Sequence, residues 1–285
     1  MGNTAMKIIG GIIIVLALTV LLAKWLLEKQ LRKDAQKFMK NISGAPLERI
    51  TENDLKGLPE PVKRYFNFIG LVGNTKTKSA RLRQHGTFRR SLNQQPMAFT
   101  ADQYFTTRRP GFMWIASFGR WMKVRDTYEH GEGSMWAKLL VLKTVANSRG
   151  DRLNQGALLR YFSEMVWFPG GYVLENIQWE ATGELTFKGT LIDQELAVTG
   201  YFEINEEGAL KHFSAERYME EEEEGDFRLE QWSIEVSDYR KIDGFMIPLG
   251  GRAIWNLEKG DFEYINLEIE EIQLNATETY QKSAY

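Results

Sequence analysis

The sequence contains no cysteine among its 285 residues. This absence excludes disulfides, thiolate metal sites and a lipid-modified N-terminal cysteine. Histidine is also scarce, because His85, His130 and His212 are the only three in the chain. None of them stands at a spacing typical of a zinc site. We therefore expect neither a metal nor a cofactor.

The chain also lacks an excess of charge of either sign. Its 36 basic and 38 acidic residues leave a formal net charge of -2. Binding of nucleic acid requires a concentrated positive field to neutralise phosphates. We therefore expect no nucleic-acid partner, whereas the sequence leaves a protein partner unknown.

One long apolar run is present near the N-terminus. Residues from Ile8 to Ala23 are apolar or small, and Trp25-Leu26-Leu27 follow after a single Lys24. About twenty such residues are long enough to cross the hydrocarbon core of a bilayer. Residues 1–27 are therefore predicted to be a transmembrane anchor. Cleavage after Ala23 is disfavoured because Leu21 stands where a signal peptidase requires a small residue.

The charges around this run give conflicting indications of its orientation. Only Lys7 precedes the run, whereas six basic residues follow it between Lys24 and Lys40. The positive-inside rule would keep the rest of the chain cytoplasmic. A short amino tail before a signal-like core more often stays inside, which would place the rest outside. The sequence leaves the side of the membrane open.

Residues 28–50 are predicted to form an amphipathic helix and a linker. Leu27, Leu31, Ala35 and Phe38 recur at helical spacing within a charged segment that ends at Met39. We expect this helix to lie on the membrane surface as an extension of the anchor. The segment from Asn41 to Pro46 is typical of a linker.

Residues 51–285 are predicted to form a single, mainly antiparallel β domain. Thr51 with Asp54 is a helix-cap pattern, and Pro61 is expected to open a helix that runs to about Ile69. From Ala80 the apolar period changes to two, and turn signals recur at hairpin spacing. The glutamates at 220–224 are expected to form a solvated hairpin tip. The predicted fold class is α+β, predominantly antiparallel β, with a curved open half-barrel sheet and a few helices.

A helix near residues 156–168 is predicted to interrupt the strands. It would carry Arg160 and Glu164 one turn apart on one face, with Met165, Trp167 and Phe168 on the other, and it would end at Pro169. A helix isolated among strands usually packs on a sheet. We expect this one to be a lid or a plug over the concave face.

Large apolar side chains along the predicted strands are expected to point mostly inward. They form either an ordinary core or the lining of an apolar cavity. These residues are Met97, Phe99, Tyr104, Phe112, Trp114, Trp121, Trp136, Trp167 and Trp255.

A set of mainly polar residues is the candidate ligand-binding site. Its members would form a polar rim above an apolar cavity, although Arg160 and Glu164 would equally make a simple surface ion pair. Asp126 with His130 would alternatively make an acid–base pair in a hydrolase-like enzyme that also uses Arg160 and Glu164. No nucleophile motif accompanies them, so we predict no catalytic residues. The candidate residues are Arg125, Asp126, Tyr128, Arg160, Tyr161, Glu164, Trp167 and Trp114.

Four motifs resemble a family of uncharacterised bacterial proteins, often membrane-anchored. They are Leu58-Pro-Glu-Pro-Val-Lys-Arg-Tyr65, Pro110-Gly-Phe-Met-Trp114, Arg125-Asp-Thr-Tyr128 and the segment from Arg160 to Pro169. The resemblance covers roughly residues 55 to 275. It implies a relative and no activity.

The order of elements also resembles, more remotely, the periplasmic lipoprotein-carrier superfamily. The similarities are the strand ending at Met113-Trp114, the single mid-chain helix and the turn from Asp243 to Pro248. This resemblance implies a half-barrel that shelters acyl chains beneath helices, and it leans toward an extracytoplasmic location. A retained anchor departs from a soluble carrier and favours a tethered binder or acceptor.

The leading hypothesis is therefore a membrane-tethered, non-catalytic protein that binds a lipid, lipoprotein or other apolar ligand. The alternatives are the hydrolase-like enzyme and a structural, membrane-associated interaction domain. The structural alternative predicts a filled core and an exposed apolar patch.

Overall fold

The computed structural model describes residues 2–40, 47–140, 142–220 and 226–285. Its helices are α1 (Gly2–Lys40), α2 (Glu60–Phe68) and α3 (Asp151–Ser163), with short 3-10 helices η1 (Glu52–Leu55), η2 (Glu164–Trp167) and η3 (Pro169–Gly171). The strands are β1 (Ser79–Phe88), β2 (Met97–Thr106), β3 (Gly111–Phe118), β4 (Met122–Glu129), β5 (Glu132–Leu139), β6 (Lys143–Arg149), β7 (Ile177–Ala181), β8 (Thr186–Asp193), β9 (Leu196–Ile204), β10 (Leu210–Glu220), β11 (Phe227–Ile242), β12 (Phe245–Leu257) and β13 (Gly260–Leu274).

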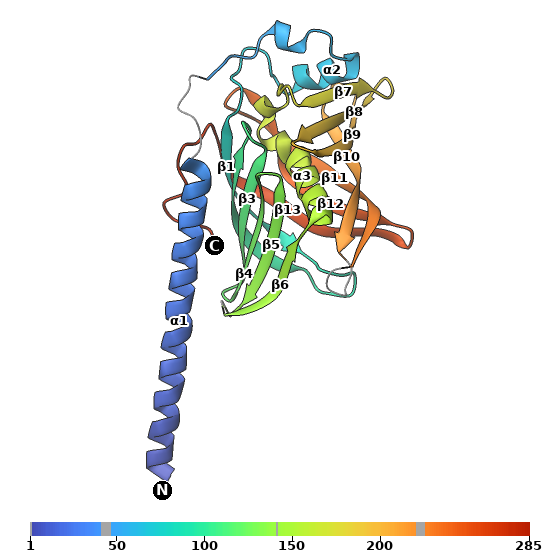
Figure 1. Ribbon diagram of the computed structural model, residues 1–285. Helices are drawn as coiled ribbons and strands as arrows, with labels where there is room; N and C mark the ends of the chain where they lie inside the picture. Colours follow the sequence, from blue (N-terminus) through green and yellow to red (C-terminus); the bar gives the residue numbers. More distant parts are fainter. Residues whose placement is uncertain (1, 41–46, 141, 221–225) are drawn as a thin grey trace.

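Within the described residues, the strands form one antiparallel sheet that curls around α3 (Figure 1). Its order is β6-β5-β4-β3-β2-β1-β13-β12-β11-β10-β9-β8-β7. Each half of the chain is thus a meander of hairpins, and the two halves join where β1 pairs with β13. The predicted half-barrel of antiparallel strands is confirmed.

The seam between β1 and β13 closes the fold. Ala80 lies opposite Leu274 and Phe88 lies opposite Ile265 along this pair. Gly86 stands at a point of close approach, where a Cβ would overlap the backbone of Asn266 and Leu267. A side chain at this position would therefore push the two halves of the sheet apart.

The helix α1 is continuous and has two parts, of which one is exposed and the other packs on the sheet. Its N-terminal part is apolar and exposed, and it could span a membrane by length and composition. Leu31, Ala35, Phe38 and Met39 are buried against the convex face of the sheet, in a cluster with side chains from β2, β3 and the C-terminal tail. Figure 1 shows the helix leaving the domain along one side of the sheet.

The expectation that residues 28–39 lie on the membrane surface is wrong. Their apolar stripe docks on the domain instead, and Leu31 is 1% exposed. The reason is that β3 is buried along its whole length, so its outward-facing Met113 and Ile115 need a cover. The predicted linker from Asn41 to Pro46 lies outside the described residues, as do Glu221 to Glu224 of the predicted acidic tip.

Local capping explains the segment before the sheet. Thr51 and Asp54 form the predicted capping box, in which the backbone N–H and hydroxyl of Thr51 both donate to the Asp54 carboxylate, at 2.8 and 2.7 Å. The helix α2 follows, with Pro61 near its start. Its residues Val62, Tyr65 and Phe66 are buried in the main core.

Candidate functional site

The segment from Asp151 to Gly171, here called the lid, lies across the concave face of the sheet. It comprises α3, η2 and η3, and α3 contacts strands from both halves, including β4, β5, β9 and β10. The helix begins at Asp151, earlier than the sequence predicts, directly after Gly150 with a φ of 113°. At the other end Gly170 packs so closely on Thr75 and Thr77 that no Cβ would fit.

The apolar side of the lid fills one part of the concave face, near Phe105 of β2 and Pro248 of β12, here called the upper part. Phe162, Met165, Trp167 and Phe168 are buried, and Phe168 packs on Phe105 with ring centroids 4.4 Å apart. The Trp167 indole N–H donates to the Pro248 carbonyl oxygen at 3.0 Å. The lid side chains thus occupy the space beneath the lid in this part of the half-barrel.

The polar side of the lid carries Arg160, which bridges two carboxylates. Its Nη1 lies 2.6 Å from Asp126 Oδ2 on β4, and its Nε lies 2.8 Å from Glu164 Oε1. The side chains of Arg160 and Glu164 are 15% and 10% exposed. The Gln103 amide donates to Glu164 Oε2 at 2.7 Å, and the Gln84 amide donates to Gln103 Oε1 at 2.7 Å.

Burial and neighbouring charges shift the pKa values of Arg160 and Glu164 in opposite directions. Burial disfavours the charge on Arg160, but Glu164 and Asp126 outweigh it and raise the pKa of Arg160. Burial also raises the pKa of Glu164, and the opposing effects of Arg160 and Gln103 do not cancel it. The pair therefore sits in a site where removing one partner would leave a nearly buried charge.

Several polar atoms around Arg160 have no hydrogen-bond partner in the structure. They are Asp126 Oδ1, Trp114 Nε1 and Gln84 Oε1, all of them buried. The Arg160 guanidinium also lies 5.1 Å from the Trp114 ring centroid and 4.9 Å from that of Phe112. The group is thus a polar island in an aromatic surround.

The structure brings together four of the sequence-predicted site residues: Trp114, Asp126, Arg160 and Glu164. Arg125 points to the convex face, where its Nη1 lies 3.0 Å from Asp34 Oδ2 of α1. The period of two along β4 separates neighbouring residues in this way. The separation of Arg125 from Asp126 could therefore have been anticipated.

The remaining predicted residues have other partners. The Tyr128 hydroxyl donates to Asp193 Oδ2 at 2.8 Å, and the Tyr161 hydroxyl donates to the Thr106 carbonyl at 3.0 Å. Trp167 lies within the core, as described. These contacts hold the lid and the two halves of the sheet together.

The structure does not pair His130 with Asp126. His130 lies in the exposed β4–β5 turn with a φ of 58°, and its Nε2 lies 3.4 Å from Glu129 Oε1. Asp126 and Glu164 do share one site, because Arg160 bridges them. The hydrolase-like set therefore converges only in part, without its imidazole.

Four of the large side chains expected to point inward do not. Met97 and Trp121 are 39% and 42% exposed near hairpin turns. Tyr104 and Trp136 lie on the convex face, in or against the α1 cluster. Each stands on the opposite pleat from the concave residues of its own strand or at a strand end, so strand period rather than hydrophobicity decides its direction.

A second arginine of the concave face, Arg217 on β10, was missed by the sequence analysis. Its guanidinium lies 4.6 Å from the Trp232 ring centroid and 5.7 Å from that of Trp255. Its Nη1 donates to the Tyr264 hydroxyl at 3.1 Å, and Trp232 Nε1 donates to the same oxygen at 3.1 Å. We call Arg217, Trp232, Trp255 and Tyr264 the Arg217 cradle.

The Arg217 guanidinium makes no ion pair among the described residues, although Glu230 stands opposite it on β11 and pairs with Arg228 instead. Within the described part of the chain, no carboxylate lies at ion-pairing distance from Arg217, and its Nε is buried without a partner. Gly156 of α3 lets the helix approach, since a Cβ there would lie 3.2 Å from Arg217 Nε. The alternation Phe213, Ala215, Arg217 along β10 was the available sequence signal for an inward arginine.

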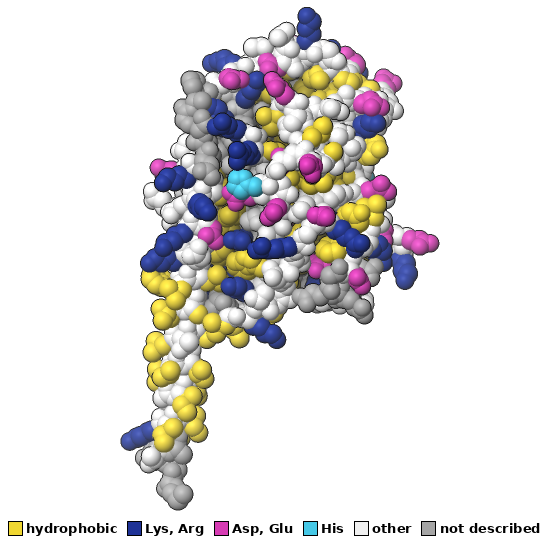
Figure 2. Space-filling view, viewed as in Figure 1, with side chains coloured by type: hydrophobic (Ala, Val, Ile, Leu, Met, Phe, Trp, Pro, Cys, Tyr) yellow, Lys and Arg dark blue, Asp and Glu magenta, His cyan; other side chains and the backbone are white. Residues whose placement is uncertain are grey.

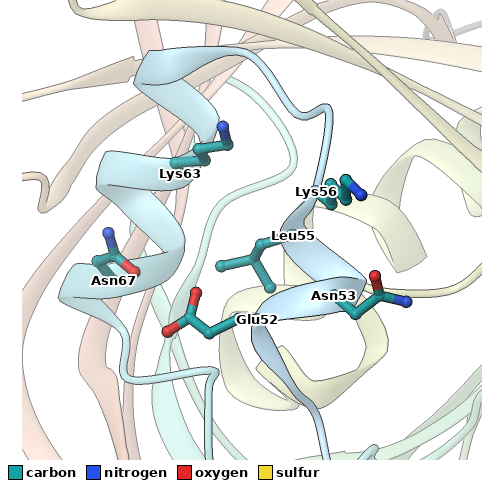
Figure 3. Close-up of a pocket in the computed structure, with 6 residues that line it drawn as sticks. All are labelled: Glu52, Asn53, Leu55, Lys56, Lys63 and Asn67. Atoms are coloured by element: carbon teal, nitrogen blue, oxygen red, sulfur yellow. The ribbon is translucent and has the colours of Figure 1, made fainter.

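Two surface depressions among the described residues lie away from the lid. One, of about 470 Å³, lies between η1 and α2 (Figure 3), with Leu55 at its base and Glu52, Lys56 and Lys63 around it. Another, of about 310 Å³, lies between the C-terminal end of α1 and residues 277–281. Over the described ranges, no group of three or more His, Asp and Glu side chains is placed to hold a metal ion.

Residues 48–267 match the family of unknown function DUF6544. The chain belongs to this family. The match agrees with the resemblance to an uncharacterised family, and it adds no activity. No curated protein matches the chain.

Among solved structures, the chain is similar to a protein of the LolA superfamily, in agreement with the remote resemblance, and to a DUF1329 family protein. A LolA superfamily protein from Nitrosomonas europaea is 9% identical with a TM-score of 0.41, and covers 76% of this chain and 92% of its own. A DUF1329 family protein from Desulfovibrio piger is 12% identical with a TM-score of 0.43. The match covers 76% of this chain and 94% of that protein. At this level of overlap, the likeness says nothing about what the chain binds.

Proposed function

We propose that this protein is a membrane-tethered, non-catalytic binding domain for an anionic amphiphile such as a fatty acid or phospholipid. The observation that carries the proposal is the Arg217 cradle. It combines an arginine that makes no ion pair among the described residues with three aromatic rings on the concave face of a half-barrel. The helix α1, which is long and apolar enough to span a membrane, would provide the tether.

The chemistry of the Arg217 cradle fits an anionic head group. Arginine presents a planar set of donors that matches carboxylate and phosphate oxygens. Because Tyr264 accepts hydrogen bonds from both Arg217 and Trp232, its own hydroxyl proton is left for a further acceptor. The Arg217 guanidinium and the Tyr264 hydroxyl would therefore be neighbouring donors to one anionic head group.

Apolar side chains beside the Arg217 cradle would take the acyl chain. Phe88 packs on Tyr264 with ring centroids 6.2 Å apart, and Phe118 packs on Phe88 at 5.7 Å. Phe88, Met122 and Leu257 are only partly buried. The lower concave face is thus less closed than the part beneath Trp167 and Phe168, and a longer chain would require the lid to shift.

Native mass spectrometry of the detergent-extracted full chain tests this function. We expect a co-purified anionic acyl lipid, whose occupancy falls several-fold in Arg217→Gln. Arg252→Gln is the matched control, because Arg252 is an exposed arginine of β12 that pairs with Glu235 and Glu263. Circular dichroism verifies that both variants fold. Absence of bound lipid in the unmodified chain, or equal occupancy in the two variants, contradicts the proposal.

A second candidate function is a structural, membrane-associated interaction domain. The filled upper concave face favours it, because Met165, Trp167 and Phe168 leave no hollow there. The same experiment separates the two functions. A chain that folds, remains membrane-bound and never carries lipid would support the structural domain.

A further inference from the structure

Three neighbouring hairpin turns end at the same edge of the half-barrel and expose apolar side chains. Phe99 pairs with Phe118, Phe118 with Met122, and Met122 with Leu139, so the β1–β2, β3–β4 and β5–β6 turns lie side by side. The exposed apolar residues at these turns, here called the rim, are Leu92, Met97, Trp121, Leu139, Leu140 and Leu142. Exposed large apolar groups gathered in this way mark an interaction surface.

The charges within the three rim turns have one sign, although Glu258 and Asp261, in or beside the neighbouring β12–β13 turn, lie at the same end of the sheet. Residues 89–98, 119–123 and 138–143 contain no acidic residue, and their charged members are Arg89, Arg90, Arg120, Lys123, Lys138 and Lys143. Turns at the opposite end of the sheet carry both signs, with Arg108 and Arg109 in the β2–β3 turn and Glu129, Glu132, Glu206, Glu207 and Asp243 in or beside three others. Apolar groups set among basic ones suit the interface of a bilayer that contains anionic lipids.

The contacts of α1 fix the level of the rim relative to the apolar helix. Phe38 lies next to Gly111 at the far end of β3, Asp34 pairs with Arg125, and Glu28 Oε1 lies 3.4 Å from Lys123 Nζ. The helix therefore runs along β3 and β4, with its N-terminal part continuing past the rim. Figure 1 shows α1 leaving the domain on this side.

The rim reaches the level at which the apolar span of α1 ends. Trp121 is two residues beyond Lys123, or about 7 Å along a strand. The same distance along a helix is about four or five residues. Counted from Glu28, this is the level of Ala23 and Lys24, next to Trp25, where side chains of interfacial type flank the apolar run. In Figure 2, basic side chains gather at the level where α1 leaves the domain.

The backbone conformation at Leu140 indicates that this leucine does not serve to stabilise the β5–β6 turn. Leu140 has a φ of 51° and is 48% exposed. Glycine or asparagine would fit this left-handed conformation at lower cost, and a leucine gains no burial in the domain from it. Strain of this kind points to a role outside the fold.

We infer that the rim inserts into the interface of the same bilayer that α1 spans, and contacts anionic lipids there. The inference rests on the membrane tether of the proposed function and not on ligand binding in the Arg217 cradle. A bilayer is the occupant because the rim is level with the end of the apolar span and its charges complement anionic head groups. The domain would then stand on the membrane at two places, α1 and the rim.

The chain lacks cysteine, so single labels can be placed in the full-length protein. Bimane is attached at Trp121→Cys, Leu140→Cys, Leu16→Cys or Glu132→Cys, and each chain is reconstituted in phosphatidylcholine–phosphatidylglycerol vesicles with brominated acyl chains. Leu16 lies within the apolar span, whereas Glu132 is exposed on the same strand as Leu139, at its far end. We expect quenching at positions 121, 140 and 16, and none at 132.

Equal fluorescence at positions 121, 140 and 132 would overturn the inference, as would an unquenched label at position 16. Shielding of the rim labels that depends on protein concentration, without quenching, would overturn it in favour of a second copy of the chain. Quenching at the rim in a preparation without co-purified lipid supports the rim and defeats the proposed function. Bound lipid without quenching at the rim would support the proposed function and contradict insertion of the rim.

A variant separates the rim from folding. Leu140→Asn, made in the Trp121→Cys chain, is expected to fold at least as stably, because asparagine tolerates a positive φ. It should nevertheless reduce quenching of the label at position 121. Unchanged quenching in this variant, with the fold intact, contradicts a contribution of Leu140 to the membrane contact.

Discussion

At the scale of the residue, the Arg160 group shows how much of a site can be predicted from helical spacing and strand alternation. Residues 126 and 160 were identified from sequence, and the structure brings them within 2.6 Å. The period of two also places Arg125 on the other face, where it meets Asp34. The roles of Gln84 and Gln103 could not be predicted, because they depend on the cross-strand register of β1 and β2.

The pH dependence of stability should report the raised pKa of Glu164. Glutamate in the unfolded chain titrates near 4.5, and the folded state holds the proton more tightly. The stabilisation from the protonated form is therefore fully present below that value, and is lost as pH rises through the raised folded pKa. We expect Glu164→Gln to flatten this decline in thermal unfolding followed from acidic to neutral pH.

The matched control for this measurement is Glu206→Gln, an exposed glutamate of the β9–β10 turn. It should keep the slope of the unmodified chain. If Glu164→Gln and the unmodified chain decline equally with pH, Glu164 does not control this part of the stability.

At the scale of the element, strong local signals were predicted and weak ones were not. The capping box at Thr51 and the helix α2 were predicted because their signals lie within a few residues. Strand β6 carries a weak sequence signal, because it is an exposed edge strand with little apolar alternation. The docking of α1 was missed because a helical stripe does not reveal whether a membrane or a sheet covers it.

The docked part of α1 should contribute strongly to the stability of the domain. Leu31 is 1% exposed, and Leu31→Ala is expected to cost about 2–5 kcal/mol of unfolding free energy. Leu18→Ala is the control, since Leu18 is 60% exposed in the apolar part of the same helix. Chemical denaturation in detergent, followed by the near-ultraviolet signal of Tyr104 and its neighbours, measures both. Equal midpoints would show that α1 does not stabilise the sheet.

At the scale of the whole molecule, the seam between β1 and β13 lies beyond local prediction. Its partners, such as Ala80 and Leu274, are almost the full length of the domain apart in sequence. The Arg217 cradle, by contrast, lies within the consecutive hairpins from β10 to β13, with Arg217 on the first of these strands and Tyr264 on the last. A regular meander predicts neighbours along the chain and not the pair that joins its two ends.

The seam makes a sharp prediction for two glycines on either side of β13. Gly86→Ala would place a Cβ against the backbone of β13, and a loss of about 1–3 kcal/mol is typical of such overpacking. Gly251→Ala meets nothing closer than 3.6 Å, and should be nearly neutral. Thermal unfolding followed by circular dichroism compares the two. Similar melting temperatures would mean that the seam tolerates a side chain.

The unbroken course of α1 from apolar span to docked stripe sets the reach of the molecule. A flexible leash would let a domain sweep through a volume around its anchor. A rigid helix fixed to the convex face permits lateral diffusion within one bilayer and rotation about its normal. Under the proposed function, such a domain would exchange a bound lipid only with that bilayer or with a partner that comes to it, and would not carry the lipid across a gap.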